Sequence, residues 1–306
     1  MAYSQGHICH YLRRLLHLRR DCPLTISGDR RRTCGEFVNG VLTLAFGLFV
    51  SGLLRTGEVV AIVALNSDLY VEWMLAVTYV GGIVAPFNYR WSLEEAKSAM
   101  EVVKPVILVV DESCSPWDLP LDNILNLKSH IRLWTYIGDV EKMESIRKPL
   151  QGAQFDPICA ADGVALICFT SGTTGQPKGV AISHNALVVQ SLAKIAFVGY
   201  GEDDVYLHAA PLCHIGGISS CIATLMAGGC HVFVPKFDAE LVSDTIEKQH
   251  VTALITVPAM MADLISFARS PCGSTEDCLT NKFLLILSLF LLLDNLKKAW
   301  PWQKIL

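Results

Sequence analysis

The sequence predicts an α/β fold in which helices pack against mostly parallel sheets. Two continuous apolar runs, 59–65 and 105–110, have the composition of strands that are buried on both faces, as strands of parallel sheets are. Segments that begin with helix-capping residues lie between these runs. This alternation of strand and helix is typical of doubly wound α/β domains. The hydrophobic content of 52% in 306 residues is ample for a sizeable core.

The elements of the first half follow from periodicity and from capping residues. Thr33 with Glu36, and Ser92 with Glu95, have the spacing of capping boxes. Asn66, Ser67 and Asp68 are typical of a helix start. We predict helices at 7–20, 33–52, 69–80 and 93–103, and strands at 24–27, 59–65, 81–86 and 105–110.

The second half continues the alternation after a less informative stretch. Residues 112–157 show little periodicity, so we predict a variable excursion that contains one strand, at 131–137. We then predict strands at 164–169, 180–182, 231–235 and 251–258, and one that begins at 205. We predict helices at 186–197, 218–226 and 240–249, and a last helix that the stretch 256–261 enters and that ends at about 267.

The loop Thr170–Gly179 has an unusual composition, with four hydroxyl residues, three glycines, one cation and no carboxylate. Glycines let backbone N–H groups converge, hydroxyls add neutral donors, and Lys178 adds a point charge, so the loop suits phosphate. It is not a Walker A loop, because Pro177 precedes the lysine and a strand follows. A polar surface hairpin is the alternative, but the absence of carboxylates and of large apolar groups does not favour it.

The string T-S-G-T-T-G-Q-P-K-G in this loop resembles the phosphate-binding signature of the AMP-forming adenylating superfamily, which includes acyl-CoA synthetases. The resemblance implies ATP with Mg²⁺ as substrate and CoA as acyl acceptor. It also implies that ATP's phosphates are surrounded by Thr170, Ser171, Gly172, Thr173, Thr174, Gly175 and Lys178.

A second candidate site lies at His214. A lone histidine is more often a core or capping residue, and composition shows no other role for this one. However, Pro211–Gly217 resembles the P-x-x-H-x-x-G element of the same superfamily. The resemblance implies that His214, with Gly216 and Gly217 beside it, lines the acyl pocket and helps to place the substrate carboxylate near ATP. Residues 57–59, 66–67 and 82–88 resemble the superfamily less specifically, since glycine and proline at such places mostly mark turns.

Residues 7–269 are similar to the plant 2-succinylbenzoate:CoA ligases of this superfamily, most clearly at 87–93, 200–208 and 256–265. The resemblance implies an AMP-forming acid:CoA ligase of the phylloquinone or menaquinone pathway, located in chloroplasts or peroxisomes. Such an enzyme adenylates an aromatic succinyl carboxylate and then exchanges AMP for CoA. The catalytic roles would fall to Lys178 and His214.

We divide the chain into a first α/β subdomain, 1–155, a second one, 156–269, and a divergent tail, 270–306. After Arg269 the sequence lacks the superfamily's Mg²⁺ carboxylate, ribose aspartate and adenylation lysine. We therefore expect the N-terminal part of an adenylating-enzyme large domain, without the small C-terminal domain. The alternative function is a truncated, catalytically incompetent nucleotide-binding or regulatory fragment that associates with the full-length enzyme.

Charge and cysteine usage exclude several function classes. A net charge of −4 does not favour nucleic acid as a partner. Eleven cysteines are scattered without zinc-ligand spacing, so we expect reduced thiols and no metal site.

The apolar run 283–293 is shorter than the roughly 20 residues of a membrane span. The polar first ten residues lack a secretory signal. The arginine-rich segment up to Arg32 leans toward organelle targeting, but it has few serines and runs directly into folded sequence, so a soluble intracellular location is the alternative.

Overall fold

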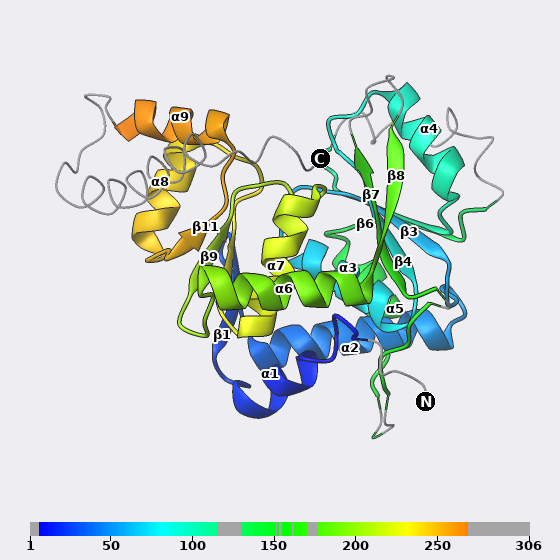
Figure 1. Cartoon of the computed structure of the whole chain (residues 1–306). Helices are drawn as coiled ribbons and strands as arrows, with labels where there is room; N and C mark the ends of the chain where they lie inside the picture. The colour runs from blue at the N-terminus through cyan, green and yellow to red at the C-terminus, as the bar shows by residue number, and fades with distance from the viewer. Residues whose placement is uncertain are drawn as a thin grey trace. The chain divides into compact units, whose positions relative to one another are not determined.

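The computed structural model describes residues 6–114, 130–150, 152, 155–160, 162–170 and 177–268. The chain forms two units, Met1–Thr256 and Val257–Leu306. The described part of the second unit contains the helix α9 (Pro258–Ala268). The sheets and the other helices belong to the first unit (Figure 1).

The larger sheet of the first unit has the strand order β6-β5-β3-β4-β7-β8. All its neighbouring strands are parallel except β7 and β8, which are antiparallel. Four residues of β3 are buried, as its continuous apolar run predicts. The strands are β3 (Val59–Val63), β4 (Ile83–Pro86), β5 (Ile107–Val110), β6 (Leu133–Tyr136), β7 (Val164–Thr170) and β8 (Lys178–Ser183).

The smaller sheet has the order β11-β9-β10-β1-β2, and only β1 and β2 are antiparallel. Each sheet takes strands from both predicted segments, 1–155 and 156–269, and the division into two subdomains stays a prediction. The strands are β1 (Pro23–Ser27), β2 (Arg30–Thr33), β9 (Val205–His208), β10 (Cys230–Phe233) and β11 (Ala253–Leu254).

The predicted strand at 251–258 is wrong in its length and its burial. β11 comprises only Ala253 and Leu254, and both residues are half-buried. The physical reason is its place at the edge of the smaller sheet, where it pairs with β9 on one side only. An apolar run alone does not distinguish an edge strand from a central one.

Both predicted capping boxes are present, at Thr33 with Glu36 and at Ser92 with Glu95. The first predicted helix is shorter than expected, because hydrogen-bonded turns occupy residues 7–11. The helix α5 was not predicted. The helices of the first unit are α1 (Leu12–Leu18), α2 (Cys34–Val50), α3 (Asp68–Tyr79), α4 (Leu93–Val103), α5 (Val140–Ile146), α6 (His184–Val198), α7 (Ile215–Ala227) and α8 (Ala239–Lys248).

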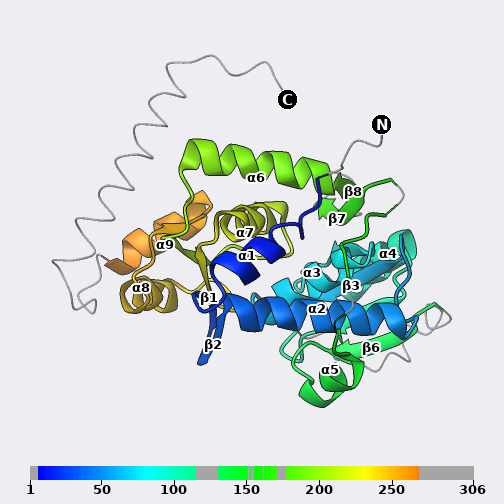
Figure 2. The same ribbon diagram turned by 90° about the horizontal axis from the view of Figure 1, so that it is seen from below.

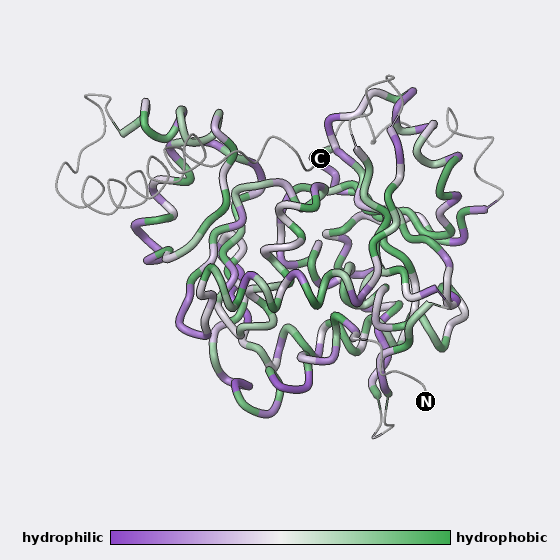
Figure 3. The backbone as a smooth tube through the Cα atoms, viewed as in Figure 1, coloured by the Kyte–Doolittle hydropathy of each residue, from purple (hydrophilic) through white to green (hydrophobic). Residues whose placement is uncertain are grey.

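Helix α3 lies at the centre of the first unit. It packs against α2, β1 and β4, so it contacts both sheets. Its side chains are buried almost all round, including Tyr70 and Trp73, as expected for a helix without a polar face. Figure 2 shows α2 running beside both sheets, from β1 to α5. Figure 3 shows apolar residues concentrated in the central strands of the larger sheet.

Two buried carboxylates on α3 join three elements through ion pairs. Asp68 and Glu72 have no exposed side-chain surface. Asp68 accepts hydrogen bonds from Arg30 and pairs with Arg32, both on β2, at 2.9 and 2.6 Å. Glu72 pairs with Arg32 and with Arg147, which directly follows α5. The charge-assisted hydrogen bonds to Asp68 raise the pKa of Arg30, so Arg30 stays protonated.

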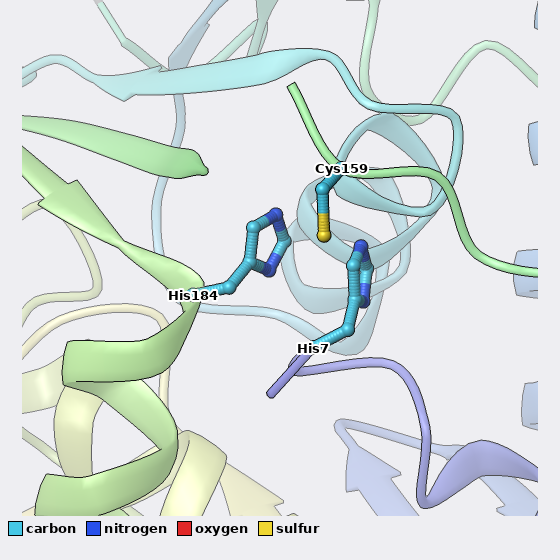
Figure 4. Close-up of side chains that lie close together, drawn as sticks. All are labelled: His7, Cys159 and His184. Carbon is cyan, nitrogen blue, oxygen red and sulfur yellow. The ribbon is translucent and has the colours of Figure 1, made fainter. Parts of the chain in front are cut away.

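The segment before α1 packs against the start of α6 through two stacked histidines. The rings of His7 and His184 lie 3.9 Å apart at an angle of 25°. Figure 4 shows them with Cys159, whose sulfur points toward them. The Ile8 N–H donates to Nδ1 of His184 at 3.4 Å. Both imidazoles are buried, and desolvation lowers the pKa of His7 to about 4 and that of His184 to about 3.

The described cysteines are free thiols, and most of them are buried, which confirms the reduced thiols predicted for these positions. Burial raises the pKa of Cys9, Cys213 and Cys221 to about 12, so these thiols stay protonated and unreactive at neutral pH. Among the described residues, no helix combines the length and the apolar composition needed to cross a membrane.

Removing one carboxylate from the ion pairs of Asp68 and Glu72 on α3 destabilises the fold. Glu72→Gln removes the buried carboxylate that the half-buried Arg32 and Arg147 share. Arg32 keeps its pair with Asp68, whereas Arg147 loses its buried partner, so we expect a loss of about 3 kcal/mol in the free energy of unfolding. Urea titration measures it. The control is Glu144→Gln, because Glu144 is 70% exposed and lies 3.7 Å from Arg147; it costs less than about 1 kcal/mol. Equal losses in the two variants would contradict this account.

The stacked histidines make the fold sensitive to acid. A histidine with a lowered pKa in the folded chain binds fewer protons there than in the unfolded chain. Its stabilising contribution is therefore lost as the pH falls from about 6.5 toward about 4.

The variant His184→Asn tests this sensitivity, because it keeps an acceptor for the Ile8 N–H and removes one titrating group. We expect its melting temperature to fall less steeply between pH 7 and pH 4 than that of the wild-type chain. The same substitution at His17, which is exposed, controls for the loss of an imidazole. Parallel pH curves for the wild-type chain and His184→Asn would refute the proposed contribution.

Candidate functional site

The predicted phosphate loop connects β7 to β8. These strands are antiparallel neighbours, which confirms that the loop joins two strands of one sheet. Thr170 and Lys178 lie directly opposite each other in the register, and both are exposed. The other predicted phosphate-binding residues lie outside the described residues: Ser171, Gly172, Thr173, Thr174 and Gly175.

A pocket of about 50 Å³ brings the phosphate loop and the histidine motif together. Thr170, at the end of β7, and His214, at the start of α7, both line it. Lys178, Gly216 and Gly217 are not among its lining residues. The residues that line it are Pro86, Asn88, Trp91, Phe169, Thr170, Cys213 and His214.

The pocket lies where several strands end, because β4 ends at Pro86 and β7 ends at Thr170. Ligands of open α/β sheets bind outside the carboxyl ends of the strands. The turn 87–91, which directly follows β4, supplies Asn88 and Trp91. Sequence reasoning treated this turn as a weak match and assigned it no site residue. Its position after a predicted parallel strand was the available signal.

His214 is the N-cap residue of α7, but its side chain makes no capping hydrogen bond. The surrounding chain partly desolvates the imidazole, and the positive charge of Arg90 acts in the same direction. Both effects lower the pKa of His214 below its ordinary value of about 6.5. His214 is therefore neutral at neutral pH and can exchange hydrogen bonds with a ligand without adding a charge.

Helix α7 begins earlier than predicted, and this is a correction. The sequence predicts a helix at 218–226, after the two glycines, whereas the helix begins at Ile215 and includes them. A Cβ on Gly217 would lie 2.5 Å from the carbonyl oxygen of Pro211, so glycine lets the first turn pack on that carbonyl. A Cβ on Gly216 would meet nothing within 4 Å.

Three aromatic rings pack together at the pocket, and two of them, Trp91 and Phe169, line it. Phe87, Trp91 and Phe169 pack at centroid distances between 5.3 and 5.4 Å. Two of the three contacts are edge-to-face, an arrangement that aromatic rings prefer. Sequence reasoning assigned none of these rings to the site, because aromatic residues after a strand are usually core residues.

Histidine and cysteine side chains meet at two other places in the described structure. In the group His7, Cys159 and His184, both ring nitrogens of His7 are engaged, one by the Cys9 N–H at 3.0 Å and one by the Ile158 carbonyl at 3.1 Å. Because the two rings are stacked, their lone pairs also cannot point at one ion. This geometry does not favour a metal.

The second group joins His208 and His231 with Cys221. The two imidazoles hydrogen-bond to each other at 2.9 Å, and their planes differ by 3°. The nitrogens that would bind an ion are therefore engaged with each other. The spacing of these residues along the sequence gives no sign of either group.

Gly216 and Gly217 of α7 differ in whether a side chain can replace their hydrogen. Gly217→Ala forces the first turn of α7 away from Pro211, so we expect a loss of about 1–3 kcal/mol in the free energy of unfolding. Gly216→Ala enters open space and is neutral or stabilising by up to about 1 kcal/mol. Thermal unfolding compares the two variants, and a tolerated Gly217→Ala would show that the close approach is not a constraint.

Known proteins share the sequence of this chain over most of its length. The model of the AMP-binding enzyme family matches residues 15–287. This match extends past Arg269, where we predict that the divergent tail begins. The 2-succinylbenzoate–CoA ligase, chloroplastic/peroxisomal, of Arabidopsis thaliana is 50% identical over 285 residues, which cover 90% of this chain and 51% of the relative. The chain thus spans about half the length of this curated relative.

Two solved structures share the fold. ATP-bound MatB from Rhodopseudomonas palustris has a TM-score of 0.73 and 26% identity, over 87% of this chain and 52% of MatB. The inhibitor-bound N-terminal domain of FACL13 from Mycobacterium tuberculosis has a TM-score of 0.76 and 21% identity, over 89% of this chain and 67% of that domain. They confirm the predicted α/β fold, that of the N-terminal part of an adenylating enzyme.

The sequence similarity extends beyond the phosphate loop and the histidine motif, which first indicated the superfamily. Because the family model matches most of its length, the chain belongs to the AMP-binding enzyme family.

Proposed function

We propose that this chain carries the ATP- and acid-binding part of an AMP-forming acid:CoA ligase whose substrate is 2-succinylbenzoate. The observation that carries the proposal is the shared pocket of Thr170 and His214. Thr170 opens the loop that suits phosphate, and His214 belongs to the motif associated with the substrate carboxylate. One pocket thus joins the two groups that an adenylation reaction must bring together.

The charges around the pocket favour anionic ligands. The described lining residues include no carboxylate. Lys178 lies opposite Thr170, and Arg90 acts electrostatically on His214 and on Cys213. The first turn of α7 has no acidic residue and no side-chain cap, so its N–H groups add partial positive charge beside the pocket. ATP and a dicarboxylate are both polyanions that fit these surroundings.

The choice of 2-succinylbenzoate rests on the relative from Arabidopsis thaliana and on the aromatic side of the pocket. That relative is named as a 2-succinylbenzoate–CoA ligase. The rings of Trp91 and Phe169 line the pocket, and they offer edges and faces against which a benzoate ring packs favourably. A purely aliphatic acid would gain less from these rings.

The chemistry proceeds in two displacements. In the first, a carboxylate oxygen of the substrate attacks the α-phosphorus of ATP, and pyrophosphate leaves as the acyl adenylate forms. In the second, the CoA thiol gives up its proton, its sulfur attacks the acyl carbon, and AMP leaves. Lys178 would offset the negative charge that develops on the phosphates. Neutral His214 would orient the carboxylate by a hydrogen bond without neutralising it.

Mg²⁺ would accompany ATP and balance part of its charge. Mg²⁺ prefers carboxylate, phosphate and water oxygens, and the described lining of the pocket supplies only neutral oxygens, such as the Thr170 hydroxyl. The phosphate oxygens of ATP would therefore be its main ligands at this pocket. Association with a full-length enzyme stays a prediction. A location in chloroplasts or peroxisomes is part of the proposal and rests on the name of the Arabidopsis thaliana relative.

ATP–pyrophosphate exchange that depends on 2-succinylbenzoate tests the proposed function. We expect the purified 306-residue chain to catalyse slow exchange, because the adenylation lysine of the superfamily is not found after Arg269. We expect Lys178→Ala to reduce this exchange further, by about 100-fold or more, because a charge that stabilises the transition state is lost. The control is Lys248→Ala, which removes an exposed lysine on α8 and leaves the rate unchanged.

The outcomes separate the possible functions. No exchange together with measurable ATP binding in a folded sample would contradict the ligase and support a nucleotide-binding fragment. Exchange with benzoate or succinate at the same rate as with 2-succinylbenzoate would contradict the proposed substrate. Exchange that survives in Lys178→Ala would remove this lysine from the mechanism.

A further inference from the structure

Asn66 connects the two sheets at the edge where the pocket lies. It follows β3 of the larger sheet, and its side chain is buried. Its amide nitrogen donates to the carbonyl oxygens of His208 and Ala210, both at 3.1 Å. Its amide oxygen accepts from the Leu212 N–H at 2.8 Å. Three main-chain groups of one segment, 208–212, thus bond to one side chain.

The backbone of Asn66 contributes a fourth bond between the sheets. Its N–H donates to the Pro235 carbonyl at 3.0 Å, two residues after the end of β10. The kinds of partner fix the amide orientation, because two carbonyls need donors and one N–H needs an acceptor. Aspartate has the same size but no donor. The environment therefore selects asparagine at this position.

The segment that Asn66 holds leads directly to His214. The His214 N–H donates to the Pro211 carbonyl at 3.2 Å, which closes a turn that includes Leu212, the last residue bonded to Asn66. Leu212 and Cys213 are buried, and Gly217 packs on the same Pro211 carbonyl. A displacement of segment 208–212 is therefore passed on to His214 and to the first turn of α7.

We propose that Asn66 is a positioning residue of the site, which holds His214 against the pocket that Thr170 lines. Asn66 is not itself a lining residue of that pocket. It acts through the main chain of segment 208–212 and fixes the separation between the histidine and the phosphate loop. The consequence for ligand binding rests on the proposed function, whereas the placement of His214 does not.

A merely structural role would change stability and leave the surroundings of His214 intact. The test therefore compares Asn66→Asp and Asn66→Ala with Ser67→Ala. Asn66→Asp keeps the acceptor for the Leu212 N–H and loses both donors. Ser67 is the N-cap of α3 and accepts from the Tyr70 N–H at 3.2 Å, so its loss weakens the adjacent helix without touching segment 208–212.

Two measurements are made on each folded variant of the full chain. The first is an NMR titration of the histidines, in which the variant His214→Asn identifies the His214 signal among the nine. The second is the affinity for ATP with Mg²⁺ by calorimetry. In both Asn66 variants we expect the pKa of His214 to rise toward about 6.5 and the ATP affinity to fall about tenfold or more. Ser67→Ala lowers the melting temperature and changes neither.

The results separate this proposal from the proposed function. An unchanged titration of His214 in a folded Asn66→Ala chain overturns the positioning role. If the wild-type chain does not bind ATP, the proposed function fails, and the titration still decides the role of Asn66. If neither Asn66 variant folds, hydrogen exchange of the wild-type chain decides instead: protection of the Leu212 amide supports the proposal, and fast exchange overturns it.

Discussion

The arrangement of the site depends on how the two sheets are joined, and the amide of Asn66 is the most specific bond between them. Without this side chain, two carbonyls and one N–H in segment 208–212 would each lose a hydrogen bond, and the loss costs about 1–3 kcal/mol where the group is buried. The carboxyl ends of β7 and β9 belong to different sheets. Because the sheets are fixed to each other there, Thr170 and His214 can line one pocket.

The buried charges of the fold are separated from the site. Asp68 and Glu72 are paired with arginines of β2 and of the stretch after α5. The described lining of the pocket holds no carboxylate and faces the positive charge of Arg90. The same chain thus uses ion pairs to hold α3 and leaves unpaired positive potential where an anion is expected to bind. A neutral His214 fits this division, since it binds without competing for charge.

Local signals predicted most of the elements, and long-range contacts account for the rest. The capping boxes and the antiparallel hairpin around 170–178 depend on residues close in sequence, so the sequence predicts them correctly. The short edge strand β11 depends on β9, which lies far from it along the chain. The pocket also depends on a long-range contact, because Trp91 becomes a site residue only when β4 lies beside β7. No local pattern distinguishes Asn66 from an ordinary residue before a helix.

The pairing of β1 with β10 has a consequence for how the chain folds during its synthesis. The two strands are parallel neighbours, although β1 ends at Ser27 and β10 begins at Cys230. At the usual ribosomal rate of about 5–20 residues per second, the intervening chain takes roughly 10–40 s to emerge. During that time the apolar residues Leu24 and Ile26, which are buried in the final fold, have no sheet to join. The nascent N-terminal hairpin is therefore a segment that chaperones would protect.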